Sequence, residues 1–491
     1  MSQPPSPRNW KTLDKDLGRI GQLELATLYV ARPMVGLGIA LAFMVLVGLI
    51  AAVFTGSGAT SAIIIAAAVL GAYMAINIGA NDVANNMGPA VGANALTLGG
   101  AIVIAALCES AGALLAGGDV VSTISKGIID PAGLEDTSIF IWAMMAALTS
   151  SALWVNLATW IGAPVSTTHA VVGGVMGAGI AAAGFGAVNW SSMSAIAASW
   201  VISPVLGGVI AASFLAFIKS QIIYQDDKIA AARRWVPVLV GIMAGAFAAY
   251  LSVKGLKKVI HIDLGTALLI GVLVGAVSYA VAAPMVRRQS IGMENRNKSL
   301  KTLFALPLVI SAALLSFAHG ANDVANAVGP LAAIVHSVEF GEFAGKVAIP
   351  SWVMIVGAFG ISFGLVLFGP KLIRMVGSQI TKLNPMRAYC VALSAAITVI
   401  VASWLGLPVS STHIAVGAVF GVGFFREWHS ERRRPRNMPF ERKKLAVEER
   451  RRRKLVRRSH FLTIVAAWLI TVPAAALLSA VVFTVLHALF V

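Results

Sequence analysis

Long apolar segments, separated by shorter polar stretches, follow one another from residue 33 to the end of the chain. Most are close to the roughly 20 residues that an α-helix needs to cross a bilayer. Membrane-spanning β-strands would be shorter and would alternate apolar with polar side chains. The pattern therefore predicts an all-α polytopic membrane protein. The segments are 33–54, 61–78, 138–161, 196–218, 263–285, 303–318, 346–370, 388–405 and 462–491.

The composition supports this class. Of 491 residues, 58% are hydrophobic and 12% are charged, whereas roughly 25% of the residues of an average globular protein are charged. The two cysteines, Cys108 and Cys390, lie inside apolar segments and form neither a disulfide framework nor a metal-binding spacing. A soluble protein is excluded.

The net charge of +17 is concentrated in one loop rather than spread over a nucleic-acid-binding surface. Residues 426–458 contain 15 of the 38 Lys and Arg residues. Basic loops beside membrane spans face the cytoplasm and attract anionic lipid headgroups. We therefore expect 426–461 to be a basic cytoplasmic loop that contacts anionic membrane lipids; a regulatory partner is the alternative.

The same rule predicts where the two termini lie. Basic residues in 1–32 indicate a cytoplasmic N-tail, followed at 33–54 by an extra, uncleaved transmembrane anchor. The basic loop precedes a last transmembrane helix at 462–491, so the C-terminus is expected on the periplasmic side. An odd number of spans, about 11–13, follows from this assignment.

The chain contains an internal repeat, which predicts a first transport repeat at 55–218 and a second at 303–425. GANDVANNMGP at 79–89 returns as GANDVANAVGP at 320–330, and GAPVSTTH at 162–169 returns as GLPVSSTH at 406–413. The connecting region 219–302 holds basic loops around two apolar segments, and charge counting leaves its number of spans open.

The GANDVAN element places an aspartate and two asparagines at membrane depth. Such groups are costly there and indicate a transport site; packing between helices is the alternative. Gly79 and Gly88-Pro89 are expected to weaken the helix at both ends of the first copy. The freed carbonyls and the side-chain oxygens would suit Na⁺. The candidate cation ligands are Asn81, Asp82, Asn85, Asn322, Asp323 and Asn326.

The PVS[ST]TH element is typical of a helix start. Pro164 and Pro408 suit an early helical position, and the hydroxyls that follow can cap the helix. A helix N-terminus surrounded by hydroxyls can bind an oxyanion without arginine, whereas the alternative role is capping alone. Two facing copies would suit a tetrahedral anion such as partly protonated phosphate. The candidate anion ligands are Ser166, Thr167, Thr168, Ser410, Ser411 and Thr412.

Three further titratable residues are candidates for coupling: Glu109, His169 and His413. A carboxyl at membrane depth should face the site or carry a proton, and a histidine can relay protons or form a structural hydrogen bond. His319 precedes the second aspartate motif, where the first copy has Ile78. The site is therefore expected to be only pseudo-symmetric.

These motifs closely resemble those of the inorganic phosphate transporter (PiT) family of secondary transporters. CESAGALL at 108–115 and SKGII at 125–129 also resemble the family, and the resemblance covers the chain from about residue 61 onward. It implies two inverted-topology repeats with broken or re-entrant helices, and phosphate held between them. Asp82 and Asp323 would then also contact phosphate. Many members carry an acidic residue where this chain has Ala392, while Glu109 matches a second acidic position.

The resemblance implies a bacterial inner-membrane symporter that imports phosphate with Na⁺ or H⁺ by alternating access. It would need no cofactor, and small-residue faces would permit a homo-oligomer. A sulfate permease on the same scaffold and a passive anion channel are alternatives. An enzyme is not expected, because Ser166 and His169 lack the glycine pattern of a nucleophile elbow.

Overall fold

The computed structural model describes residues 34–56, 58, 60–129, 136–161, 165–255, 262–341, 349–379, 383–432 and 458–491. The predicted N-tail at 1–32 and most of the predicted basic loop at 426–461 lie outside these ranges.

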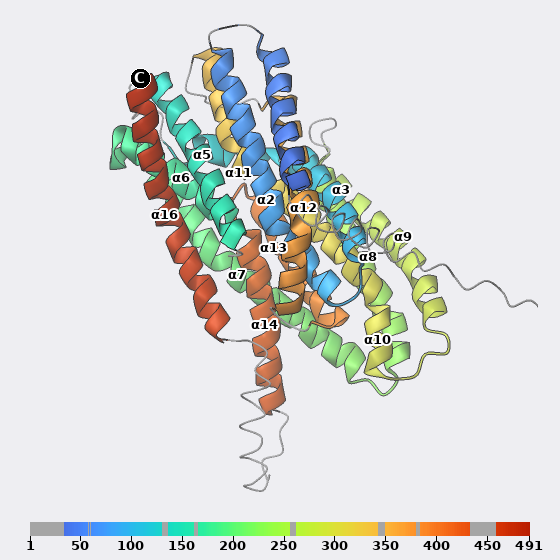
Figure 1. Cartoon of the computed structure of the whole chain (residues 1–491). Coiled ribbons are helices and arrows are strands. Elements are labelled where there is room, and N and C mark those ends of the chain that lie inside the picture. The colour runs from blue at the N-terminus through green and yellow to red at the C-terminus, as the bar shows by residue number, and fades with distance from the viewer. Residues whose placement is uncertain are drawn as a thin grey trace, which may run out of the picture.

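Eleven helices in the described residues are long and apolar enough to cross a membrane. The expectation of an all-α multi-pass membrane protein with about 11–13 spans is confirmed, and the region 219–302 contributes two of the helices (Figure 1). The sides on which the termini lie and the domain boundaries stay predictions. The spanning helices are Met34–Thr55, α2 (Ser61–Gly92), α3 (Leu98–Ala116), α5 (Thr137–Ile161), α7 (Trp190–Ile218), α8 (Lys228–Lys254), α9 (Leu264–Gln289), α11 (Ala305–Phe340), α12 (Ser351–Gln379), α13 (Pro385–Trp404) and α16 (Arg458–Phe490).

Both GANDVAN copies lie inside unbroken helices, so the expected weakening at their glycines and proline is wrong. Helix α2 continues through Gly79 and Pro89, and α11 continues through Pro330. A continuous helix satisfies its own backbone hydrogen bonds, which is the stable state at membrane depth. The glycines serve packing instead, because a Cβ at Gly79 would overlap the backbone of Ile361 on α12.

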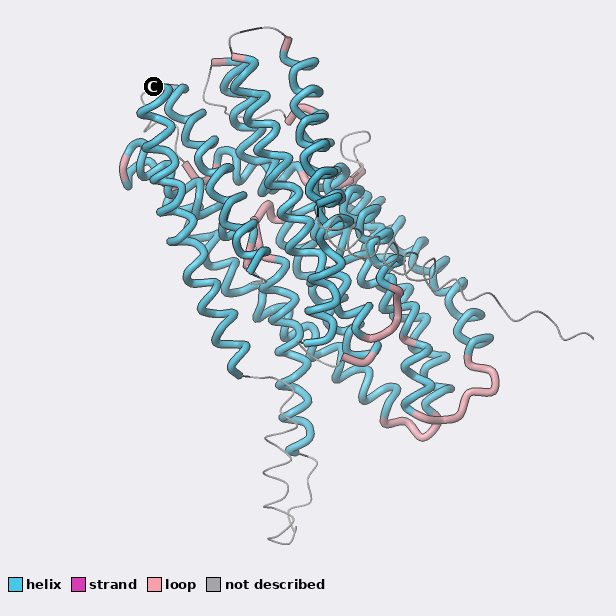
Figure 2. Tube along the Cα trace, viewed as in Figure 1, coloured by secondary structure: helices cyan, strands magenta, loops and turns pink. Residues whose placement is uncertain are grey.

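The helix breaks occur at the PVS[ST]TH elements, as the hydroxyl pattern predicts. Helix α5 ends at Ile161 and α6 (Thr167–Ala183) begins six residues later, while a non-helical stretch separates α13 from α14 (Ser411–Arg432). Pro408 lies three residues before the first residue of α14, so the expected early helical position is wrong for it, and Pro164 lies outside the described residues. Figure 2 shows loop segments in the interior of the bundle as well as at its ends.

One helix of each repeat packs on the GANDVAN-containing helix of the other repeat. Helix α3 of the first repeat packs on α11 of the second, where a Cβ at Gly112 would overlap the backbone of Phe317. Helix α12 of the second repeat packs on α2 of the first, where Gly364 meets Ile76 in the same way. Corresponding residues thus make corresponding contacts. The opposite membrane orientation of the repeats stays a prediction.

The two helices that begin at the PVS[ST]TH elements, α6 and α14, pack against α16 and α7 respectively. Gly177 on α6 approaches the backbone of Ala476 on α16, and Gly421 on α14 approaches that of Gly208 on α7. Helices α8 and α9 pack on each other at the edge of the bundle (Figure 1). The repeated motifs therefore lie at the centre, shielded by neighbouring helices.

Candidate functional site

Two buried aspartates form the centre of the candidate site. Asp82 on α2 and Asp323 on α11 are each 1% exposed. Thr167 donates a hydrogen bond to Asp82 Oδ2 at 2.9 Å, and Ser411 donates to Asp323 Oδ2 at 3.0 Å. In each repeat, the aspartate of the helix is therefore joined to the hydroxyl that follows the helix-start serine.

Hydrogen bonds between the repeats close this cluster. Asn85 Nδ2 donates to Thr412 Oγ1 at 2.8 Å, and Asn326 Nδ2 donates to Thr168 Oγ1 at 3.2 Å. Thr412 Oγ1 in turn lies 3.1 Å from Asp82 Oδ1 and donates to it. The second asparagine of each GANDVAN copy is thus bound to the helix start of the other repeat, so the two motifs form one polar cluster.

The first asparagine of each copy is hydrogen-bonded to a hydroxyl near the end of the helix that precedes the PVS[ST]TH element. Asn81 pairs with the Thr159 hydroxyl at 2.9 Å, and Asn322 pairs with the Ser403 hydroxyl at 3.0 Å. With the amide of Asn322 turned by 180°, its nitrogen would donate to Asp323 Oδ1 and to the Val409 carbonyl, both at 2.9 Å. Both asparagines therefore link an aspartate-bearing helix to the last turn of the helix that precedes the connector, α5 for Asn81 and α13 for Asn322.

The serines of the two starts act as helix caps, which confirms that part of the sequence interpretation. Ser166 Oγ accepts a hydrogen bond from the His169 backbone N–H at 3.1 Å, and Ser410 Oγ accepts one from His413 at 3.3 Å. The N-terminal ends of α6 and α14 are accordingly directed at the cluster of hydroxyls and aspartates. The positive end of each helix dipole favours a bound anion there.

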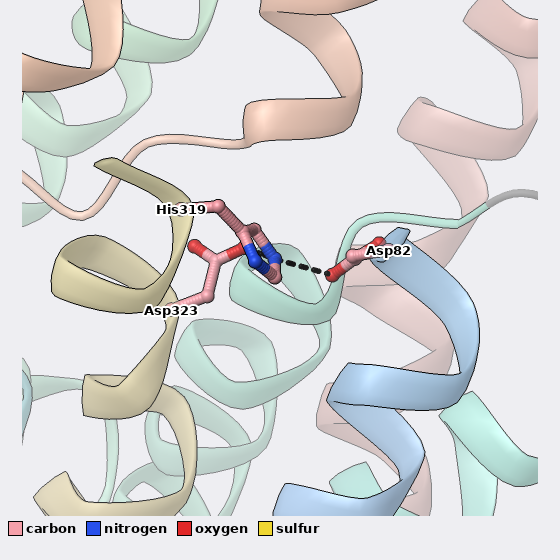
Figure 3. Close-up of side chains that lie close together, drawn as sticks. All are labelled: Asp82, His319 and Asp323. Carbon is pink, nitrogen blue, oxygen red and sulfur yellow. Dashed lines mark ion pairs between the residues drawn. The ribbon is translucent and has the colours of Figure 1, made fainter. Parts of the chain in front are cut away.

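His319 lies between the two aspartates, a position that the sequence interpretation did not assign to it. Its Nε2 is 2.9 Å from Asp323 Oδ2 and 3.7 Å from Asp82 Oδ2, and the side chain is buried (Figure 3). One donor atom from each of these three residues lies within 4.8 Å of the others. This spacing could hold a cation. The sequence signal was the four-residue spacing to Asp323, which places both side chains on one face of α11.

Glu109 joins the same cluster from α3. Its Oε1 is 3.2 Å from His319 Nδ1 and accepts a hydrogen bond from Asn86 Nδ2 at 2.9 Å. The second repeat has Ala327 in place of Asn86, and Ile361 occupies the position on α12 that corresponds to Glu109. The histidine, the glutamate and its amide partner are therefore present on one side of the site alone.

His169 and His413, the other coupling candidates, meet each other instead of the aspartates. Their ring centroids are 4.3 Å apart, and each ring packs on a tryptophan, Trp200 for His169 and Trp468 for His413. The first repeat contributes His169 and the second His413, so this contact also joins the repeats. The backbone N–H of each histidine also donates to the serine cap of its own helix.

The charge balance of the site indicates what it can bind. Three buried carboxyls, those of Asp82, Glu109 and Asp323, surround one histidine. Within the described ranges, no Lys or Arg forms an ion pair with any of them. Buried carboxylates are costly unless a proton or a cation compensates them. An additional anion at these helix starts would therefore be disfavoured unless protons or cations compensate the carboxylates.

The chain is similar to known proteins. Residues 78–479 match the phosphate transporter family. A protein of Helicobacter pylori strain J99, named as a candidate phosphate permease, is 45% identical, covering 96% of this chain and 98% of its own. The chloroplastic inorganic phosphate transporter 2-1 of Arabidopsis thaliana is 38% identical over 84% of this chain and 70% of its own. A solved structure of a sodium-dependent phosphate transporter is 35% identical with a TM-score of 0.79, covering 87% of this chain and all of that one.

The chain belongs to the phosphate transporter family. Its relatives are transporters and permeases, so it is not an enzyme. The resemblance carried by the repeated motifs is thereby confirmed.

Proposed function

We propose that this member of the phosphate transporter family is a symporter that imports inorganic phosphate, driven by Na⁺, through alternating access in the bacterial inner membrane. The observation that carries the proposal is the single polar cluster built from both repeats: Asn85 binds Thr412 and Asn326 binds Thr168. A site shared in this way changes whenever one repeat moves relative to the other.

Cations would bind first, at the carboxylates. The ligands would be the oxygens of Asp82 and Asp323 together with the asparagines of the same turns, Asn81, Asn85, Asn322 and Asn326. Carboxylate and amide oxygens are hard ligands that suit Na⁺. Their binding neutralises the negative charge that would otherwise repel phosphate.

Phosphate would then bind between the two helix starts. The hydroxyls of Ser166, Thr167 and Thr168 face it from α6, and those of Ser410, Ser411 and Thr412 from α14. A hydroxyl can donate to an unprotonated phosphate oxygen or accept from a protonated one. Sulfate offers no such proton, so the pairing of hydroxyls with Asp82 and Asp323 favours phosphate.

The coupling ion is proposed as Na⁺ for two reasons. The cluster is rich in amide and carboxylate oxygens, and the similar solved structure is that of a sodium-dependent transporter. His319 and Glu109, which contact each other, offer a site for a proton as well. His319 lies closer to Asp323 than to Asp82, which supports unequal cation sites. These two residues are proposed to set the stoichiometry.

Reconstitution into proteoliposomes tests the proposal. An inward Na⁺ gradient should drive labelled phosphate above its equilibrium level, and a pH gradient without Na⁺ should drive far less. Uptake that ignores Na⁺ would overturn the coupling ion. Uptake that never exceeds equilibrium would indicate a channel, and stronger competition by sulfate than by unlabelled phosphate would indicate a sulfate permease.

A further inference from the structure

A wide groove opens between α7, α14 and α16, on the side of the helix starts that faces away from the aspartates. Its volume is about 1080 Å³, slightly above the range of roughly 300–1,000 Å³ found for small-molecule sites. In Figure 1, α16 runs along the outer flank of the bundle beside α7 and α14. The space is therefore sufficient for a long-chain ligand.

The walls of this groove, which we call the α7–α16 groove, are apolar. Val201, Val205 and Val209 repeat every four residues along α7 and are 68%, 63% and 58% exposed. Leu469 of α16 faces the same space and is 72% exposed. Because α7 and α16 are spanning helices, this exposed stripe lies at the depth of the lipid chains.

The length of the groove matches one leaflet of a bilayer. Its lining on α14 extends from His413 to Trp428, which at 1.5 Å per residue corresponds to about 22 Å. Half of a hydrocarbon core of about 30 Å plus part of the headgroup region covers a similar distance. Trp428 lies at the outer end, and tryptophan is enriched at the membrane–water interface.

A positive charge lies at this outer end. Lys219 follows α7 in a π-helical turn (Lys219–Ile223), and its Nζ is 5.2 Å from the ring centroid of Phe425, which lines the groove. At the end of this turn, the Tyr224 hydroxyl is 2.8 Å from His429 Nε2 and joins the turn to α14. A lysine beside aromatic residues at the interface suits an anionic headgroup.

We propose that the α7–α16 groove binds one anionic phospholipid. Its acyl chain lies along the valine stripe of α7, and its phosphate lies near Lys219. A free anion would not use the apolar walls, and a detergent-like neutral chain would not need Lys219. The two features together select a lipid with both parts.

The inner end of the groove links this lipid to the transport site. His169 and His413 form part of the groove lining, and their backbone N–H groups are bound by the serine caps Ser166 and Ser410. Helix α16 packs on α6, whereas α7 packs on α14. A bound acyl chain therefore fills the space between the pair α6 and α16, which contains the first helix start, and the pair α7 and α14, which contains the second.

A matched pair of tryptophan substitutions tests the site. Val205→Trp fills the groove, and Val277→Trp on α9 places the same side chain at a position that is also 63% exposed but lies outside the groove. The full-length protein is purified with added phosphatidylglycerol, and retained lipid is counted by native mass spectrometry. We expect Val205→Trp to retain about tenfold less lipid, equivalent to about 1.4 kcal/mol, and Val277→Trp to retain as much as the parent protein.

A second pair tests the headgroup. Lys219→Gln should lower retention of phosphatidylglycerol but not of phosphatidylcholine, whereas Lys301→Gln, an exposed lysine on α10 (Asn297–Leu303), should change neither. Equal retention by the two tryptophan variants would overturn the site, and equal binding of the two lipids would overturn the anionic selectivity. A parent dimer that Val205→Trp converts to monomers would show that a second copy covers the groove instead.

Discussion

In both GANDVAN copies the aspartate accepts a hydrogen bond from a hydroxyl of its own repeat's helix start, but the other partners of the two aspartates differ. Asp82 accepts hydrogen bonds from two hydroxyls, those of Thr167 and Thr412, one from each repeat. Asp323 accepts one from Ser411 and has His319 as its other near partner. Duplication has kept the hydroxyl at each start, whereas one copy alone has a histidine.

This difference separates two parts of the site. The contacts that both repeats make would bind a symmetric ligand such as phosphate. The contacts of His319, Glu109 and Asn86, which have no counterpart at the corresponding positions of the other repeat, can make the two cation positions unequal. Substitution of a residue whose contact occurs in both repeats should therefore abolish transport, whichever repeat carries the substitution. Substitution of His319, Glu109 or Asn86 should instead change the dependence of uptake on the ion.

Replacement of either aspartate should have the largest effect. Asp82→Asn and Asp323→Asn keep the size of the side chain but remove the charge that would bind a cation. Hydrogen bonds to charged groups contribute about 1.5–3 kcal/mol each, so we expect Na⁺-driven uptake to fall by about 100-fold or more. Folding, followed by gel filtration and thermal unfolding, should be retained. Asp263→Asn, at the exposed start of α9, is the control and should transport normally. Full transport by both site variants would exclude these carboxylates.

His319→Gln should have the next largest effect and tests the difference between the copies directly. Glutamine keeps hydrogen bonding to Asp323 but cannot carry the positive charge. We expect uptake at low Na⁺ to fall by roughly tenfold, which corresponds to about 1.4 kcal/mol, and the Na⁺ concentration at half-maximal uptake to change. His336→Gln, on the same helix but outside the aspartate cluster, should leave the Na⁺ dependence unchanged. An unchanged dependence in both variants would mean that the two copies bind cations alike.

Much of this site can be predicted from the sequence because polar groups are costly at membrane depth. Asp82, Asp323 and the hydroxyls of both starts stand out from apolar surroundings, and the structure brings them together. The helix starts are also predictable, because Ser166 and Ser410 are followed by further hydroxyls that suit a first turn.

The partners across the repeats could not be predicted. Asn85 and Thr412 are 327 residues apart, and no local pattern specifies that they meet. Nor does the sequence distinguish a glycine that breaks a helix from one that lets two helices approach. Gly320 is of the second kind, because a Cβ there would overlap the backbone of Glu109. That close approach also explains why Glu109 reaches His319.

Threonine substitutions should have smaller effects, and they can compare how much each of the two helix starts contributes to phosphate binding. Thr412 accepts from Asn85 and donates to Asp82, whereas the corresponding Thr168 donates to the Val409 carbonyl. We expect Thr412→Val to raise the KM for phosphate by about tenfold and Thr168→Val by about threefold, the effects of roughly 1.4 and 0.7 kcal/mol. Equal shifts would show that phosphate binding ignores the asymmetry.

The control for these threonine variants is Thr398→Val. Thr398 is a buried threonine on α13 whose hydroxyl donates to the Ser394 carbonyl, so its removal should leave the KM unchanged. A KM shift in this variant as large as that in Thr412→Val would assign the effect to packing rather than to the site.

The smallest effects are expected where the repeats meet symmetrically. Ser110 and Ser362 each lie two residues before the glycine that packs on a GANDVAN helix, and their hydroxyl oxygens are 2.6 Å apart. Each single alanine substitution leaves one hydroxyl without this partner and should cost about 1 kcal/mol of stability in thermal unfolding, with little change in uptake. The double substitution removes both groups, so its cost should be less than the sum of the single costs. Equal single costs would mean that the asymmetry is confined to the charged residues, whereas unequal costs would show that it extends into the packing between the repeats.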